Sequence, residues 1–183
     1  MRYRIKISQH DFEELRQLVT KDHPQEGAAF ALAGVNFQKD VLDVIVRRPV
    51  PVPKELFSLQ EEYHLKLAPQ AINGLISLCE KNKLGAILCH SHPADIPYSP
   101  SDDHGEARIF EVLRKFIPKN APTASILFYP GGVRGRIWLP DQSRPVPISE
   151  ICIIGQVIQR IENTPKRLEM FQLVVGRGLE VMK

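Results

Sequence analysis

The sequence has few cysteines, no long hydrophobic run and no concentration of charge of one sign. Its cysteines are odd in number and irregularly spaced, at positions 79, 89 and 152. This argues against the disulfide framework of a small secreted protein and favours a reducing compartment. No apolar run approaches the roughly 20 residues that a membrane-spanning helix needs. Residues 1–6 alternate charged and apolar side chains, unlike a signal peptide. We therefore expect a cytoplasmic protein with no membrane partner.

The basic residues are scattered along the chain. Lysine and arginine number 24 against 21 acidic residues, a formal net charge of +3, and no five basic residues are consecutive. Proteins that bind nucleic acid usually concentrate basic residues in a patch or stripe. We therefore expect no nucleic-acid partner.

The remaining composition is that of a globular domain. Hydrophobic residues make up 43% and charged residues 25% of the 183 positions, and a chain of this size buries about 70% of its surface on folding. Segments with the periodicity of strands and of helices alternate along the sequence. They predict an α/β or α+β fold with one mixed β-sheet flanked by helices. We expect one domain over residues 1–155 and a helical extension over 156–183.

Several element boundaries follow from local signals. Ser8 is expected to cap a helix that ends near Asp22, because His23-Pro24 disfavours its continuation. The prolines at 49, 51 and 53 restrict the segment after Val46 to an edge strand or a loop. The expected strands are 2–7, 28–32, 41–46, 64–67, 84–89, 124–129 and 133–139. The expected helices are 68–83, the segment after Ser99 with Ile109, Val112, Leu113, Phe116 and Ile117 inward, and 164–183, while 148–161 is expected to turn from strand into helix.

The segment after the apolar strand 84–89 contains the residues with the clearest chemistry. His90 and His92 are two residues apart, so they point to the same face if the strand continues. Two imidazoles on one face can share one metal ion, each about 2.0–2.1 Å from a zinc ion. Cys89 faces the opposite side and is expected in the core, and Ser91 is expected to be structural.

A third ligand is expected from the helix that follows. Ser99 reads as its N-cap and Pro100 as its first residue, which places Asp102 in the first turn. The helix dipole there favours the ionised carboxylate that a metal requires. Two histidines and one aspartate leave zinc an open position for water. Glu26, a charge at the start of an apolar strand, is the candidate base.

These residues together match a known pattern. In chain order they are Glu26, Leu32, Gly34, His90-Ser91-His92-Pro93, Ser99 and Asp102. The pattern resembles that of the JAMM metalloproteases, also called JAB or MPN-plus, over about residues 1–155. The combination is far more specific than two histidines alone.

The resemblance implies a fold, a cofactor and a set of roles. The fold would be the JAB/MPN fold, which is cytidine-deaminase-like. By similarity, His90, His92 and Asp102 would bind zinc, Glu26 would be the general acid and base, and Ser99 would help stabilise the oxyanion. The substrate would be the C-terminal tail of a ubiquitin-like or sulfur-carrier protein, and prokaryotic members often act beside an adenylating, ubiquitin-activating-type enzyme.

The chain departs from the family pattern at one point. The family usually has its aspartate eleven residues and its serine eight residues beyond the second histidine. Those positions are here Asp103 and Pro100. Serine and aspartate keep their mutual spacing only as Ser99 and Asp102, after a loop one residue shorter. We prefer Asp102 as the ligand because the cap fixes that pair, and Asp103 remains the alternative.

Other functions fit less well. The sequence has no His-Glu-x-x-His motif of a zincin, no Pro-Cys-x-x-Cys of a nucleobase deaminase and no phosphate-binding glycine loop. The alternative function is a non-catalytic MPN-like scaffold that holds partners through its C-terminal helix. A scaffold would need none of the metal ligands.

Overall fold

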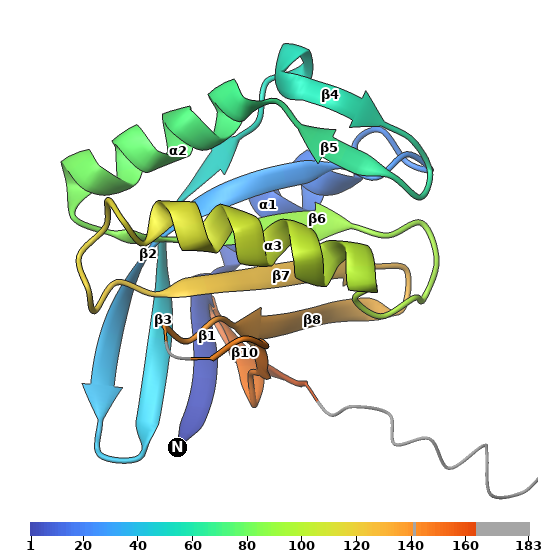
Figure 1. Cartoon of the computed structure of the whole chain (residues 1–183). Coiled ribbons are helices and arrows are strands. Elements are labelled where there is room, and N and C mark those ends of the chain that lie inside the picture. The colour runs from blue at the N-terminus through green and yellow to red at the C-terminus, as the bar shows by residue number, and fades with distance from the viewer. Residues whose placement is uncertain (141, 164–183) are drawn as a thin grey trace, which may run out of the picture.

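The computed structural model describes residues 1–140 and 142–163 (Figure 1). Its helices are α1 (Gln9–Thr20), α2 (Pro69–Asn82) and α3 (Pro100–Leu113), with a short 3-10 helix η1 (Lys54–Leu56). Its strands are β1 (Arg2–Ser8), β2 (Ala28–Gln38), β3 (Val41–Pro51), β4 (Phe57–Gln60), β5 (Leu65–Leu67), β6 (Gly85–Ser91), β7 (Thr123–Tyr129), β8 (Gly132–Ile137), β9 (Val146–Pro147), β10 (Glu150–Ile154) and β11 (Ile158–Glu162).

Nine strands form one mixed sheet in the order β11-β10-β1-β3-β2-β6-β7-β8-β9, and β4 pairs with β5 in a separate hairpin. The pairs β1–β3, β1–β10 and β6–β7 are parallel, and the others are antiparallel. The sheet curls so that segments far apart in its order meet: Asn163, which follows β11, donates its Nδ2 to the Gly135 carbonyl of β8 at 2.9 Å (Figure 1).

Helices cover both faces of this sheet. Figure 1 shows α2 and α3 on the near face and α1 behind the strands. Helix α1 is capped by Ser8, whose hydroxyl accepts the Asp11 amide, and it buries Leu15 and Val19 against one face. Phe110 of α3 and Leu75 of α2 belong to the core cluster on the other face. The prediction of a mixed sheet flanked by helices, an α+β fold, is confirmed.

The proline-rich segment forms an edge, as predicted, but remains in the sheet. Strand β3 continues through Pro51, pairing with β2 along its whole length, whereas β1 pairs with β3 only as far as Ile45. The end of β3 that contains Pro49 and Pro51 therefore has a strand on one side only, where a missing amide hydrogen can be tolerated.

The prediction of a helix after residue 155 is wrong for the part that the structure describes. Strands β10 and β11 pair antiparallel, from Glu150↔Glu162 to Ile154↔Ile158. The β-branched isoleucines of both strands favour extended backbone, and β10 also pairs with β1, so the segment completes the sheet. The helix expected over 164–183 lies outside the described residues, and the division at residue 155 stays a prediction.

The predicted inward face of α3 also needs correction. The helix ends at Leu113, and its buried residues are Glu106, Phe110 and Leu113. Val112 and Phe116 are exposed instead. The helix ends before the turn that precedes Pro118, so its apolar stripe is shorter than expected and includes a carboxylate.

Two findings bear on the broad classification of the chain. The cysteines at 79, 89 and 152 are buried free thiols, in agreement with the expected core position of Cys89. Within residues 1–140 and 142–163, no helix has the length and apolar character needed to cross a membrane.

Candidate metal centre

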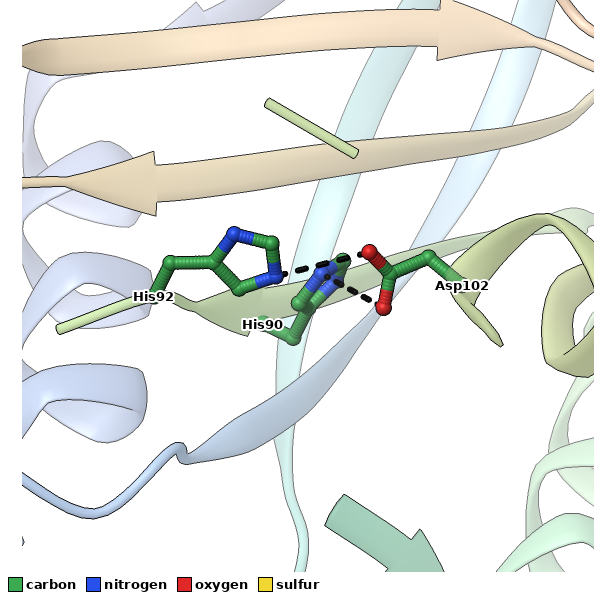
Figure 2. Close-up of side chains that lie close together, drawn as sticks. All are labelled: His90, His92 and Asp102. Atoms are coloured by element: carbon green, nitrogen blue, oxygen red, sulfur yellow. Dashed lines mark ion pairs between the residues drawn. The ribbon is translucent and has the colours of Figure 1, made fainter. Parts of the chain in front are cut away.

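Two histidines and one aspartate meet where β6 ends and α3 begins. His90 lies in β6, His92 directly follows it, and Asp102 lies in the first turn of α3. One ligand atom from each residue can be chosen so that all three lie within 4.8 Å of one another. Figure 2 shows the Asp102 carboxylate directed toward both rings, and its Oδ1 lies 3.5 Å from His90 Nε2 and its Oδ2 3.4 Å from His92 Nε2.

The sheet places both imidazoles on the same face. His90 pairs with Ala28 of β2 and Leu127 of β7. The His92 amide donates to the Phe128 carbonyl at 2.9 Å, which continues the ladder beyond β6. The alternation of the strand therefore reaches His92, and the two ring centroids are 5.0 Å apart.

The helix cap orients the aspartate. The Ser99 hydroxyl accepts the Asp102 amide at 3.1 Å, and Asp102 Oδ2 accepts the Ser99 amide at 2.6 Å and its hydroxyl at 2.8 Å. The predicted cap is confirmed as a full capping box with Pro100 at the first helical position. Asp103 does not reach the histidines, because its carboxylate pairs with Arg136.

His90 is suited to metal binding because it is neutral. Burial lowers its pKa to about 4, and nearby Asp102 only partly opposes this. Its Nε2 is buried and has no hydrogen-bond partner in the described part of the chain. Leaving such an atom unsatisfied costs about 1–3 kcal/mol, and a metal ion would satisfy it.

His92 is held in an orientation that presents its other nitrogen. Its Nδ1 lies 3.0 Å from the Ile96 carbonyl. Because a carbonyl can only accept, Nδ1 carries a proton, and the neutral ring offers the Nε2 lone pair to the site. Burial alone would lower the pKa of His92, but hydrogen bonds to Asp102 and Ile96 raise it. A metal ion would therefore displace a proton from this ring.

Asp102 is ionised. Burial would raise its pKa, but the hydrogen bond to His92, the nearby His90 and the hydrogen bonds from Ser99 hold that pKa well below its usual range. The group therefore combines one charged oxygen donor with two nitrogen donors, a set that zinc and other divalent transition metals accept.

Glu26 lies beside this group but comes from another part of the fold. It precedes β2, is only 7% exposed, and its Oε1 is 3.6 Å from His92 Nε2. Burial raises its pKa from 4.5 to about 7, with His92 opposing and Asp102 adding to the shift. Its backbone is held by the β4–β5 hairpin, since its amide donates to the Glu61 carbonyl at 2.9 Å and its carbonyl accepts Gln60 Nε2 at 3.0 Å.

Gly27 and Ser91 hold the backbone on the C-terminal side of Glu26. The Ser91 hydroxyl accepts the Gly27 amide at 3.0 Å and donates to the Val19 carbonyl at 2.6 Å. A Cβ atom at Gly27 would lie 2.2 Å from the Val19 oxygen. Only glycine permits this approach of α1 to the start of β2, and the structural role expected of Ser91 is confirmed.

The sequence did not predict a buried polar network that lies next to His90, His92 and Asp102, the three residues called the metal group below. Arg136 of β8 pairs with Glu106 of α3, which also accepts Trp138 Nε1 at 2.6 Å and the Ser125 hydroxyl at 2.8 Å. Tyr98 stacks its ring against the Arg136 guanidinium. The available signal was Glu106 at helical spacing from Phe110 and Leu113, a carboxylate on an apolar face.

The structure thus brings His90, His92 and Asp102 together as a group that could hold a metal ion. Glu26 stands next to them, and Ser99 is bound to Asp102. The roles assigned to these residues, including the part of Ser99 in oxyanion stabilisation, stay predictions.

Comparison with known proteins supports the fold only. No family model and no curated protein match the chain. Among solved structures, it is similar to the solution structure of protein DSY2949 from Desulfitobacterium hafniense, a structural-genomics target. The match has a TM-score of 0.51 at 20% sequence identity and covers 84% of this chain and 94% of that one.

Proposed function

We propose that this chain is a zinc-dependent metallopeptidase of the JAMM type, built on a JAB/MPN fold, that hydrolyses peptide or isopeptide bonds. One observation supports this most. Two imidazoles and an ionised carboxylate converge beside a second buried carboxylate, Glu26, that is held by a different part of the chain. A metal site that served only to stabilise the fold would have no use for that second acid.

The donor set fits zinc. His90 Nε2 is a buried donor atom without a partner among residues 1–140 and 142–163, and Asp102 carries the negative charge that favours a cation. Zinc with three protein ligands keeps one position for water, lowers the pKa of that water and polarises a carbonyl group.

Glu26 would move the protons of the reaction. A group whose pKa lies near 7 can both accept and release a proton near neutral pH. Glu26 would take a proton from the attacking water and deliver it to the leaving amine. Ser99 would keep Asp102 ionised and oriented through the capping box, and we assign to its hydroxyl the further task of stabilising the oxyanion.

The proposed substrate is the C-terminal tail of a ubiquitin-like or sulfur-carrier protein, in deconjugation or precursor processing. This follows from the family resemblance of the sequence motif. An extended tail can bind by adding a strand to a sheet edge, and the β4–β5 hairpin next to Glu26 offers such an edge. An adenylating enzyme is the proposed partner.

The proposal is tested by incubating zinc-loaded full chain with a panel of ubiquitin-like C-terminal fusions and detecting cleavage by mass. Glu26→Gln should retain zinc but lose about 10²–10⁴-fold in turnover, because general acid–base catalysis contributes that much. Glu111→Gln is the control, since its carboxylate is an exposed group of α3 that belongs neither to the metal site nor to the hairpin, and it should keep full turnover.

The scaffold alternative predicts a different result. A scaffold would cleave none of the fusions, and Glu26→Gln would leave its binding to partners unchanged. Cleavage by wild-type protein that Glu26→Gln leaves intact would contradict the role proposed for Glu26.

A further inference from the structure

Arg136 is a buried charge that the proposed reaction does not use. It lies in β8, is 6% exposed, and pairs with Ser125 of β7 in the sheet register. Its Nε donates to Glu106 Oε2 at 3.0 Å and to the Ser125 hydroxyl at 3.3 Å. Burying an ion pair often stabilises a fold no more than apolar residues of similar volume would. The presence of Arg136 therefore calls for a reason other than stability.

The guanidinium contacts one residue beside Asp102 and one beside His90. Its Nη1 pairs with the carboxylate of Asp103, the residue after Asp102. Its Cζ lies 3.6 Å from the centroid of the Tyr98 ring. That ring meets the His90 ring edge-on, with centroids 5.7 Å apart and an interplanar angle of 64°. Arg136 thus reaches Asp102 through its neighbour on the helix and His90 through an aromatic ring.

These contacts set the rotation of α3 about its own axis, which the helix cap does not determine. Adjacent residues of an α-helix point about 100° apart, so a partial rotation of α3 about its axis would exchange Asp102 for Asp103. The capping box sets where the helix begins. Arg136 holds Asp103 and also Glu106, three residues later on the same helix face. Two contacts on one face, made by a rigid planar fork, set the rotation of the helix.

We propose that Arg136 is a positioning residue of the metal centre, which orients α3 and the Tyr98 ring so that Asp102 faces the two histidines while Asp103 is turned away. This inference rests on the proposed metal site. It also accounts for the choice between two adjacent aspartates that the sequence motif leaves open.

The test adds Co²⁺ to the chelator-treated full chain and has two readouts. One is the affinity for Co²⁺, and the other is the visible absorption of the bound ion, whose intensity reports its coordination geometry. Arg136→Met should lower Co²⁺ affinity about 10–100-fold, the usual effect of losing a group that orients metal ligands. Asp103→Asn should also lower the Co²⁺ affinity, but by a smaller factor. Both should alter the absorption band. The Asp103 side chain is 54% exposed, so this variant folds even if Arg136→Met does not.

A third variant separates positioning from stability. Trp138→Phe removes the hydrogen bond to Glu106 Oε2 but leaves the contacts of Arg136 with Asp103 and Tyr98, and it keeps an aromatic ring at the position whose ring centroid is 5.7 Å from Arg136 Cζ. It should lower the melting temperature and keep wild-type Co²⁺ affinity and absorption. Affinity that falls in step with melting temperature across all three variants would overturn the inference.

The outcomes for wild type and variants distinguish two failures. Wild-type Co²⁺ affinity and an unchanged band in both Arg136→Met and Asp103→Asn would overturn the positioning role and leave the metal site standing. A wild-type chain that binds no Co²⁺ would overturn the metal site and the inference together.

Discussion

At the scale of single residues, Glu26 shows how a functional group can oppose stability. Its carboxyl is 7% exposed, and burial raises its pKa from 4.5 to about 7. The folded protein therefore binds this proton more tightly than the unfolded chain does. As the pH rises from about 4.5 to 7, the folded state loses stability, because it must bury a charge that the unfolded chain leaves in water.

The raised pKa of Glu26 predicts how the stability of a single variant depends on pH. In metal-free protein, Glu26→Gln should match wild-type stability near pH 4.5 and exceed it at pH 8 by up to about 3 kcal/mol, the equivalent of this pKa shift. Urea unfolding of both proteins with a chelator present, at several pH values, measures the difference. Stability curves for the two proteins that run parallel across this range would contradict the burial argument.

The sequence was informative about residues whose positions depend on local geometry. The alternation of a strand aligns His90 with His92, and a capping box links Ser99 to Asp102; both relations act over three residues or fewer. Arg136 and Tyr98 could not be placed in this way. Their contact joins positions 38 residues apart, and the sheet brings them together, because β7 pairs both with β6, which precedes the Tyr98 loop, and with β8, which contains Arg136.

At the scale of elements, the junction between α1 and β2 positions Glu26. The Ser91 hydroxyl bridges the Val19 carbonyl and the Gly27 amide. The absence of a side chain at Gly27 allows the two backbones to meet. The position of Glu26, the proposed general base, thus depends on a close contact between the end of a helix and the start of a strand.

Substituting this glycine should therefore be costly. Gly27→Ala places a Cβ atom 2.2 Å from the Val19 oxygen, and we expect a loss of at least about 2 kcal/mol in the free energy of unfolding. Gly74→Ala is the control, because a Cβ atom at that position of α2 would meet no heavy atom of the described chain within 4 Å apart from its chain neighbours and the adjoining helix backbone. It should be neutral or stabilising by up to about 1 kcal/mol. Equal effects of the two substitutions would contradict the packing proposed for the junction.

Element boundaries were predictable where a local signal marks them. Ser8 and Ser99 cap α1 and α3 as expected, since each hydroxyl accepts an amide three residues ahead. Strand β11 was not predictable, because its residues adopt the extended form by pairing with β10. The spacing of its isoleucines is compatible with a helix or with a strand. The segment is a strand because it pairs with the edge of β10 that β1 leaves free.

At the scale of the whole molecule, the curled sheet gathers the metal group and Glu26 from distant segments. The parallel strands β6 and β7 end at the same edge, where His90 and His92 lie, and ligand sites of sheets with helices on both faces commonly occur at such ends. The first turn of α3 adds Asp102 from one face, and the start of β2 adds Glu26. Asp102 itself lies in the first turn of α3, where the helix dipole favours an ionised carboxylate.

The most direct test of the account is a zinc titration of the chelator-treated full chain against a competing coloured chelator. Wild-type protein should bind one zinc ion tightly, and His92→Ala and Asp102→Ala should abolish that binding. His104→Ala should retain it, because His104 is an exposed histidine of the same helix as Asp102. Zinc binding that survives Asp102→Ala, or that is lost only in Asp103→Ala, would contradict the metal centre described above.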